Sequence, residues 1–308
     1  MSAQDVTASA VRLRATRRRW GEDVVKVVLA LCALISILTT VGIVVSLFIP
    51  AIEFFGDVSL WDFLSGRIWA PLFEPSSFGV LPLVAGTLLV SLCAALVCLP
   101  FGLGAAIYLS EYARSTERQI LKPTLEILAG VPTVVYGYFA LTAISPILQD
   151  LGVQDGVFSA LSAALVMGVM LIPTVASLSE DAMSAVPRDL RDGAYALGSN
   201  RMQVALRVVV PAAISGIIAS FMLAISRAVG ETMIVLIAAG GQPNLTFDPT
   251  QAVQTMTAFI AATGQGDVPT GSLEYKTIFA VGATLFVITL AMNLVSIRLV
   301  RKFREVYE

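Results

Sequence analysis

The stretch Val24–Ile49, VVKVVLALCALISILTTVGIVVSLFI, is a long apolar run with a single charged residue, Lys26. About 20 mostly apolar residues are enough to cross a bilayer as a helix. The run is too long for the apolar region of a cleaved signal peptide, which has about 7–15 residues, so we interpret it as a retained membrane helix. The whole composition agrees, because 56% of the residues are hydrophobic and only 14% are charged, against roughly 25% charged residues in soluble domains.

Five further apolar runs follow, and each is long enough to cross a membrane. They cover Phe78–Ser110, Leu121–Leu148, Val157–Leu178, Pro211–Gly240 and Thr277–Val300. The sequence therefore predicts an all-α, polytopic membrane protein with six transmembrane helices. We divide it into an N-terminal tail (1–23), a first membrane helix (24–49), a connecting segment (50–77), a transmembrane domain (78–300) with a long loop at 180–211, and a C-terminal tail (301–308). A short helix is also expected at residues 251–260.

Basic residues gather on one side of the predicted spans. Apart from Arg67, Lys276 and Arg227, the 20 Lys and Arg residues lie in or next to the two tails and the connections after the second and fourth spans. Because connections rich in Lys and Arg stay in the cytoplasm, we expect both termini there and the segment 50–77 outside. That segment holds aromatic residues typical of a membrane interface, namely Phe54, Phe55, Trp61, Phe63, Trp69 and Phe73.

Two absences restrict the chemistry. The chain contains no histidine, which excludes most zinc, haem and Ser–His or Cys–His chemistry. Its three cysteines, Cys32, Cys93 and Cys98, lie in apolar runs and are interpreted as packing residues. No G-x-x-x-x-G-K-[ST] motif occurs, so the chain does not cradle ATP in the P-loop manner. We expect no bound metal or cofactor and no nucleic-acid partner; active transport would draw energy from a partner or an ion gradient.

The connection between the fourth and fifth spans has an order of its own. Residues 187–201 read PRDLRDGAYALGSNR. The proline favours a helix start, Gly198-Ser199-Asn200 breaks the helix, and a second short helix is expected to lead to Pro211. This pattern predicts a helix–turn–helix projection whose small residues allow a partner to approach closely. The alternative is an ordinary solvated loop, but such loops are shorter.

The projection resembles the EAA loop of ABC importer permeases, whose pattern is E-A-A, three residues, Gly, nine residues and I-x-L-P. Here Asp192-Gly193-Ala194, Gly198 and the stretch ending at Pro211 keep that spacing. In the family this loop docks into a separate ATPase subunit, which holds ATP and Mg²⁺. The resemblance implies a type I ABC importer transmembrane domain with an ATPase-coupling surface made of Asp192, Gly193, Ala194, Leu197, Gly198 and Pro211. Gly193 departs from the pattern and costs about 1 kcal/mol of helix propensity relative to alanine.

Three other stretches are similar to the permeases of phosphate-specific ABC importers, of the PstC-like type. They are YLSEY at 108–112, LEILAGVPTVVYGYF at 125–139 and ISRAVGETM at 225–233. The resemblance implies a permease subunit in a bacterial plasma membrane that imports inorganic phosphate with a second permease, two ATPase subunits and an extracytoplasmic phosphate-binding protein. A permease for molybdate or sulfate is an alternative, and an ion-gradient-driven carrier has less support. A membrane enzyme has the least, because no nucleophile–base pair is visible.

Arg227 stands in the middle of the fifth predicted span, and Glu231 follows four residues later. A charge near the bilayer centre costs about 2.5–3.5 kcal/mol and commonly faces a polar cavity. On one helix from Ala212 to Gly240 the two side chains would share a face. We predict that they line the substrate pathway, where the guanidinium binds a tetrahedral oxyanion. The carboxylate would accept a hydrogen bond from the proton that phosphate keeps and would repel sulfate, which has none. The alternative is a structural ion pair.

Span three offers a second candidate surface. Gly130 and Pro132 are expected to loosen its helix, which is tolerated in a membrane only beside protein or a water-filled cavity. Three residues nearby could then supply hydroxyl groups to an anion: Thr133, Tyr136 and Tyr138. A kinked helix that packs against its neighbours explains these residues equally well. Pro173 and Thr174 in span four are interpreted as packing residues.

Overall fold

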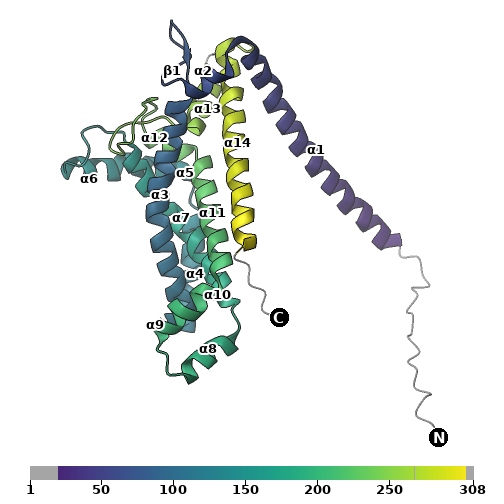
Figure 1. Cartoon of the computed structure of the whole chain (residues 1–308), viewed down its shortest axis with the longest axis vertical. Coiled ribbons are helices and arrows are strands. Elements are labelled where there is room, and N and C mark those ends of the chain that lie inside the picture. Colours follow the sequence, from purple (N-terminus) through teal and green to yellow (C-terminus); the bar gives the residue numbers. More distant parts are fainter. Residues whose placement is uncertain (1–19, 267, 303–308) are drawn as a thin grey trace. The chain divides into compact units, whose positions relative to one another are not determined.

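The computed structural model describes residues 20–266 and 268–302, and these residues are mostly helical (Figure 1). Within them, four helices are long and apolar enough to cross a membrane: α1 (Trp20–Asp57), α3 (Leu81–Ile107) with its continuation η1 (Tyr108–Tyr112), α7 (Ala160–Ser184) and α14 (Leu273–Lys302). Counting each of two bent helix pairs as one span gives six, the predicted number. Part of the orientation prediction falls on residues outside the described ranges: Arg12, Arg14, Arg17, Arg18, Arg19 and Arg304.

The chain divides into two compact units. The described part of the first is the segment of α1 from Trp20 to Leu47. This helix is apolar around its circumference, as expected of a helix surrounded by lipid or other membrane helices. Glu22 and Asp23 lie in its first turn, where negative charge is favourable. The second unit begins at Phe48 and contains every other element.

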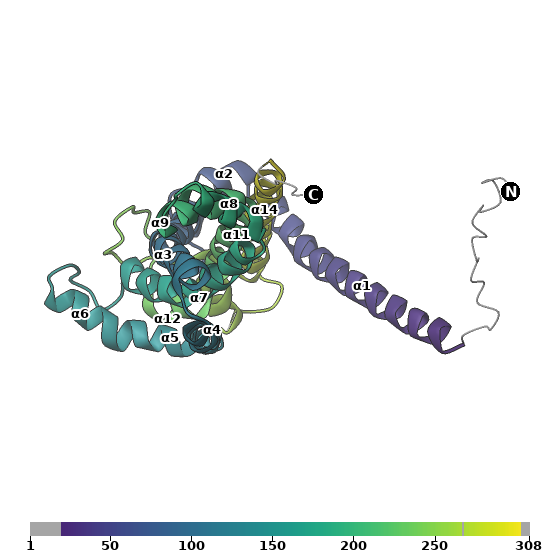
Figure 2. The same cartoon turned by 90° about the horizontal axis from the view of Figure 1, so that it is seen from below.

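Three helices form the centre of the second unit: α3, α7 and α11 (Ile214–Gly230) contact one another, and Figure 2 shows them side by side. Two glycines allow α3 and α7 to approach closely. A Cβ added at Gly168 would lie 2.7 Å from the Cβ of Val97, and one added at Gly102 would lie 2.6 Å from the Cβ of Val175. Small residues at such crossings let helix backbones pack tightly within a membrane.

The third predicted span is bent. It consists of α4 (Ser115–Ala129), α5 (Thr133–Phe139), η2 (Ala140–Ile144) and α6 (Ser145–Asp150), and its two halves meet at 86°. The bend lies at Gly130–Pro132, as predicted, but it breaks the helix instead of only loosening it. Proline lacks the N–H that would continue the ladder, and it restricts the residue before it to extended conformations. Both views show α6 projecting from the rest of the unit (Figures 1 and 2).

The fifth predicted span is also broken, and the prediction of one helix from Ala212 to Gly240 was wrong. α11 ends at Gly230, Glu231 is extended (φ −66°, ψ 135°), and a short α12 (Met233–Ala238) follows. Glycine favours a helix end, and the Glu231 carboxylate accepts the N–H of Met233 at 3.1 Å. The Glu231 carboxylate thus accepts a hydrogen bond from an N–H that would have bonded to a backbone carbonyl in a continuous helix.

Shorter elements lie at the two ends of the second unit (Figure 1). One end, which we call the α8 end, carries α8 (Arg188–Ala196), α9 (Arg201–Val204), η3 (Ala205–Val209) and α10 (Val210–Ala212). The opposite end carries α2 (Leu60–Ser65), the antiparallel pair β1 (Trp69–Ala70) and β2 (Ser77–Phe78), and α13 (Met256–Gly264). The helix expected at residues 251–260 corresponds to α13, which begins five residues later because Thr255 caps it through a bond from the Ala258 N–H.

Part of the aromatic segment 50–77 forms a core instead of an interfacial belt. Phe54, Phe63 and Trp69 are buried, and their rings stack edge to face with one another and with Phe259. Such ring pairs contribute about 0.5–1.5 kcal/mol beyond their buried area. The interfacial interpretation was therefore wrong for these three rings, whereas Trp61 and Phe73 are exposed.

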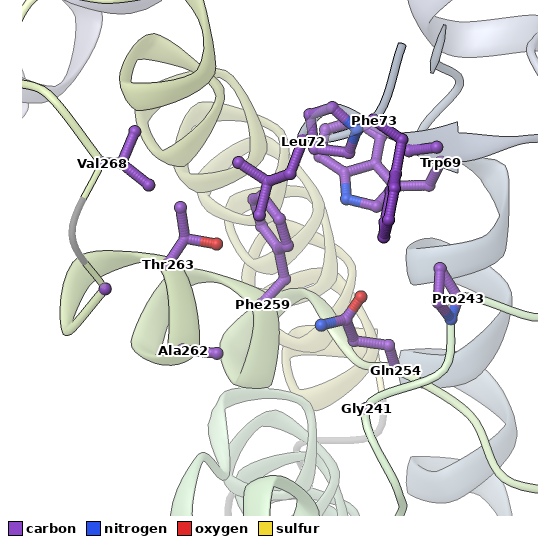
Figure 3. A pocket seen from close by; sticks show the side chains of 13 residues that line it. Trp69, Leu72, Phe73, Gly241, Pro243, Gln254, Phe259, Ala262, Thr263 and Val268 are labelled. Carbon is purple, nitrogen blue, oxygen red and sulfur yellow. The ribbon is translucent and has the colours of Figure 1, made fainter. Parts of the chain in front are cut away.

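A cavity of about 440 Å³ lies between β1, α13 and the preceding loop (Figure 3). Its wall is mostly apolar, and Figure 3 shows the Gln254 and Thr263 side chains beside the rings of Trp69, Phe73 and Phe259. This hollow is at the end of the unit opposite α8. The charge pattern of the sequence predicts that this end lies outside the membrane.

Candidate functional site

The predicted projection is present at the α8 end, and its local hydrogen bonds explain its shape. α8 follows Pro187 and ends at Ala196, with Leu197 as its C-cap, after which Gly198 takes φ +82°, a conformation that L side chains rarely adopt. The Gly198 N–H donates to the Tyr195 carbonyl at 2.9 Å. Asn200 then caps α9, accepting from the Gln203 N–H at 2.9 Å. The helix–turn–helix prediction is confirmed.

Five of the six predicted coupling residues are exposed: Asp192, Gly193, Leu197, Gly198 and Pro211. Leu197 is 89% exposed at the turn. The sixth, Ala194, is half-buried and packs toward the cluster that includes Val204 and Val209. Leu197 therefore lies exposed at the tip of the projection, and Ala194 packs α8 against the rest of the domain.

A charged network behind the projection was missed by the sequence analysis. Glu180, near the end of α7, is fully buried, and its carboxylate binds Arg118 and Lys122 of α4, with Lys122 Nζ 2.8 Å from Oε2. Lys122 also reaches Asp181 at 2.7 Å, and the Ser184 hydroxyl donates to Glu180 at 2.7 Å. Because no side chain of α4 is buried, this network is a main attachment of α4 to α7.

Removing the two cations should destabilise the protein. In an Arg118→Met/Lys122→Met variant the buried Glu180 carboxylate loses its partners, which costs about 3 kcal/mol for a buried pair broken on one side. We expect a clearly lower melting temperature of the purified protein in detergent. Adding Glu180→Gln should restore most of the loss, since the uncompensated charge is then gone.

The matched control is Lys276→Met, because Lys276 pairs with the more exposed Glu53 at 3.1 Å. Exposed pairs contribute about 0–1 kcal/mol, so this variant should melt close to wild type. If the Arg118→Met/Lys122→Met variant had the same melting temperature as the control, the role assigned to Glu180 would be contradicted.

Arg227 lies in the last turn of α11, and its side chain is exposed. Nη1 donates to the hydroxyl of Thr174 at 3.2 Å, and Tyr136 is close enough for the charge of Arg227 to act on it. Among the described residues Arg227 forms no ion pair. Thr174, interpreted from sequence as a packing residue, is thus its partner. Because Thr174 stands near the middle of α7, Arg227 is placed at mid-depth of a spanning helix.

Glu231 does not share a helix face with Arg227, contrary to the prediction, because α11 ends between them. The carboxylate is largely buried and its Oε1 accepts the N–H groups of Met233 and Ile234 at 3.1 and 3.5 Å. Its backbone carbonyl accepts the Thr257 hydroxyl at 2.6 Å, which ties the break to α13. Glu231 therefore fixes the backbone beside Arg227, and its Oε2 has no described hydrogen-bond partner.

The three candidate residues of span three have different surroundings in the structure. Tyr136 bridges the bend, because its hydroxyl donates a hydrogen bond to the Leu128 carbonyl at 2.9 Å. Thr133 is the half-buried first residue of α5. The Tyr138 side chain is 64% exposed. The structure thus brings Arg227 of α11 together with Thr174 of α7, with Tyr136 of α5 within range of the Arg227 charge, and gives no such link for Thr133 or Tyr138.

Comparisons with known proteins identify the family of the chain. Residues 98–305 match the family described as the binding-protein-dependent transport system inner membrane component. The probable ABC transporter permease YqgH of Bacillus subtilis is 33% identical over 282 residues, which cover 90% of this chain and 91% of that protein. The phosphate transport system permease PstC of Mesorhizobium japonicum is 32% identical over 270 residues, 80% of each chain.

A solved structure shows the same fold. The bacterial alginate ABC transporter, in complex with a periplasmic protein bound to an alginate pentasaccharide, superposes with a TM-score of 0.59. The alignment covers 92% of this chain and 98% of that chain, at 16% sequence identity. Identity at this level supports the shared architecture of the transmembrane domain and nothing about the substrate.

Proposed function

We propose, given that the chain belongs to the family of binding-protein-dependent transport system inner membrane components and is a permease subunit of an ABC importer, that its substrate is inorganic phosphate. The observation that carries this proposal is the guanidinium of Arg227. It is exposed beside Thr174 near the middle of α7 and has no carboxylate partner among the described residues. An unneutralised charge at that depth is costly, and a passing anion would neutralise it.

The groups around Arg227 suit a protonated tetrahedral anion. A guanidinium offers parallel N–H donors that match two oxygens of phosphate. Phosphate keeps at least one proton near neutral pH, and we propose that the carboxylate of Glu231, four residues after Arg227 in the chain, accepts a hydrogen bond from that proton, whereas it would repel sulfate. The similarity to PstC of M. japonicum, a phosphate transport system permease, supports the same substrate.

The exposed projection supports a proposal about the partners. We propose that α8 and the tip around Leu197 dock on one of two ATPase subunits, which bind ATP and Mg²⁺, and that a second permease completes the pathway. An extracytoplasmic phosphate-binding protein would deliver the anion at the end that carries α13. In this arrangement the protein lies in a bacterial plasma membrane with both termini in the cytoplasm, and it catalyses no covalent step itself.

The test is ATP hydrolysis by the reconstituted complex of both permeases, the ATPase subunits and the binding protein in liposomes. Phosphate, sulfate and molybdate are compared at equal concentration. We expect phosphate alone to stimulate hydrolysis and to accumulate inside the liposomes. Stimulation by sulfate or molybdate to the same extent would overturn the phosphate assignment while leaving the importer family intact.

A further inference from the structure

Arg191 of α8 contacts the ends of two membrane helices at once. Its Nη2 donates to the carbonyl of Met183 in the last turn of α7 at 2.8 Å, and its Nη1 to the carbonyl of Val186, two residues after that helix, at 2.6 Å. The same guanidinium binds Glu111 Oε1 through Nε at 3.3 Å and Nη2 at 3.0 Å. Glu111 belongs to η1, the continuation of α3. One side chain therefore fastens α8 to both α3 and α7.

This ion pair is shielded from solvent. The Arg191 side chain is 16% exposed and that of Glu111 is 6% exposed, and the Ser110 hydroxyl donates to the same Glu111 oxygen at 3.0 Å. Charged groups in such a setting form strong hydrogen bonds, and loss of one partner leaves the other charge uncompensated. Lysine would keep the charge but not the fork of donors that reaches three acceptors.

Little else holds α8 in place. No residue of α8 is buried, and Ala194 is its member that packs against the neighbouring apolar cluster. Arg188, three residues before Arg191 on the same helix, is exposed and has no side-chain partner in the described part of the chain. The attachment of the projection is thus polar and is concentrated at one residue.

We infer that Arg191 is a positioning residue for energy coupling, which holds α8 against the ends of α3 and α7 through Glu111 and the two carbonyls. When an ATPase subunit displaces the projection, the spanning helices then move with it instead of the connection bending alone. The inference rests on the proposed function of the chain as an ATP-driven permease. The Arg191–Glu111 pair would transmit movement of the projection to the membrane helices, and it lies outside both the tip around Leu197 and the Arg227 site.

The experiment compares Arg191→Gln, Arg191→Lys, Glu111→Gln and the Arg191→Gln/Glu111→Gln pair with wild type in the reconstituted complex. The control is Arg298→Gln, which removes the same charge from an exposed position on α14, outside the proposed docking surface. Retained ATPase subunits, ATP hydrolysis and phosphate accumulated per ATP are measured. We expect each single glutamine variant to keep its ATPase subunits and to hydrolyse ATP, while phosphate per ATP falls about fivefold or more, the lower end of typical coupling energies.

The pattern across variants decides the matter. The Arg191→Gln/Glu111→Gln variant should be no worse than Arg191→Gln alone, because Arg191→Gln already removes the ion pair with Glu111 together with the bonds to the two carbonyls. Arg191→Lys should be intermediate, and Arg298→Gln should match wild type. An unchanged ratio of phosphate to ATP, additive losses, or a loss of bound ATPase in proportion to transport would each overturn the inference. Absence of phosphate-stimulated hydrolysis in wild type would instead overturn the proposed function, and this inference with it.

Discussion

Phosphate uptake should fall about 100-fold in an Arg227→Gln variant, although the complex still assembles and inserts. Hydrogen bonds from a charged donor contribute about 1.5–3 kcal/mol each, and 1.4 kcal/mol corresponds to a factor of ten, so the loss of a two-bond contact has an effect of this order. The fold should survive because Arg227 is exposed and bonds to one described side chain, the hydroxyl of Thr174. Uptake of labelled phosphate into liposomes measures the loss.

Two further variants separate charge from geometry at this site. Arg227→Lys keeps the charge but presents a single ammonium, so uptake should be intermediate. Thr174→Val removes the hydroxyl at nearly constant volume and should lower uptake only a few-fold, since about 1 kcal/mol is lost with one hydrogen bond. Arg298→Gln serves as the control for the loss of a positive charge, because Arg298 is exposed near the end of α14. Normal uptake by Arg227→Gln would remove Arg227 from the pathway.

The projection could be predicted because its signals are local. The proline before α8, Gly198 and the Asn200–Gln203 cap lie within one short stretch, and each acts on backbone groups a few residues away. Helix ends depend on such nearby bonds, so a single sequence contains the necessary information. The same reasoning located the bend at Pro132, whose missing N–H acts on its own helix.

The contacts that position the site could not be predicted in this way. Arg227 and Thr174 are 53 residues apart in sequence, and Lys122 and Glu180 are 58 apart. Periodicity within one helix shows which face is polar but not which helix supplies the partner. Arg118 and Lys122 were therefore interpreted only as evidence of orientation, and Thr174 as packing, until the packing of α4, α7 and α11 brought these residues together.

The break after α11 was missed for a different reason. The run Pro211–Gly240 is mostly apolar and carries no charge apart from Arg227 and Glu231, and hydropathy alone favours one helix. The local signal was Gly230, which ends helices readily, followed by a carboxylate able to accept the freed N–H of Met233. If that signal had been given more weight than hydropathy, the helix would have been predicted to end before Glu231, and the two side chains would not have been placed on one face. Intramembrane breaks of this kind are tolerated where protein satisfies the backbone, as Thr257 does here.

ATPase binding and transport should both fall at least about tenfold in a Gly198→Val variant. Gly198 has φ +82° at the end of α8, and a β-branched residue adopts that conformation only with strain, whose cost of about 1–3 kcal/mol corresponds to a tenfold effect near 1.4 kcal/mol. The turn that presents Leu197 would rearrange to relieve it. No atom lies within 4 Å of a Cβ built at Gly198, so crowding inside the described chain is not the cause.

Matched substitutions on the same projection identify backbone conformation as the reason. Gly198→Asn adds a larger side chain that tolerates positive φ, so it should retain most ATPase binding, whereas Gly198→Ala should be intermediate. Gly193→Ala, inside α8 where φ is ordinary and nothing lies within 4 Å of an added Cβ, should bind as well as wild type. Co-purification of ATPase subunits with each variant ranks them. If Gly198→Asn lost binding as fully as Gly198→Val, the partner surface itself would exclude a side chain there, and close docking at Gly198 would replace turn geometry as the explanation.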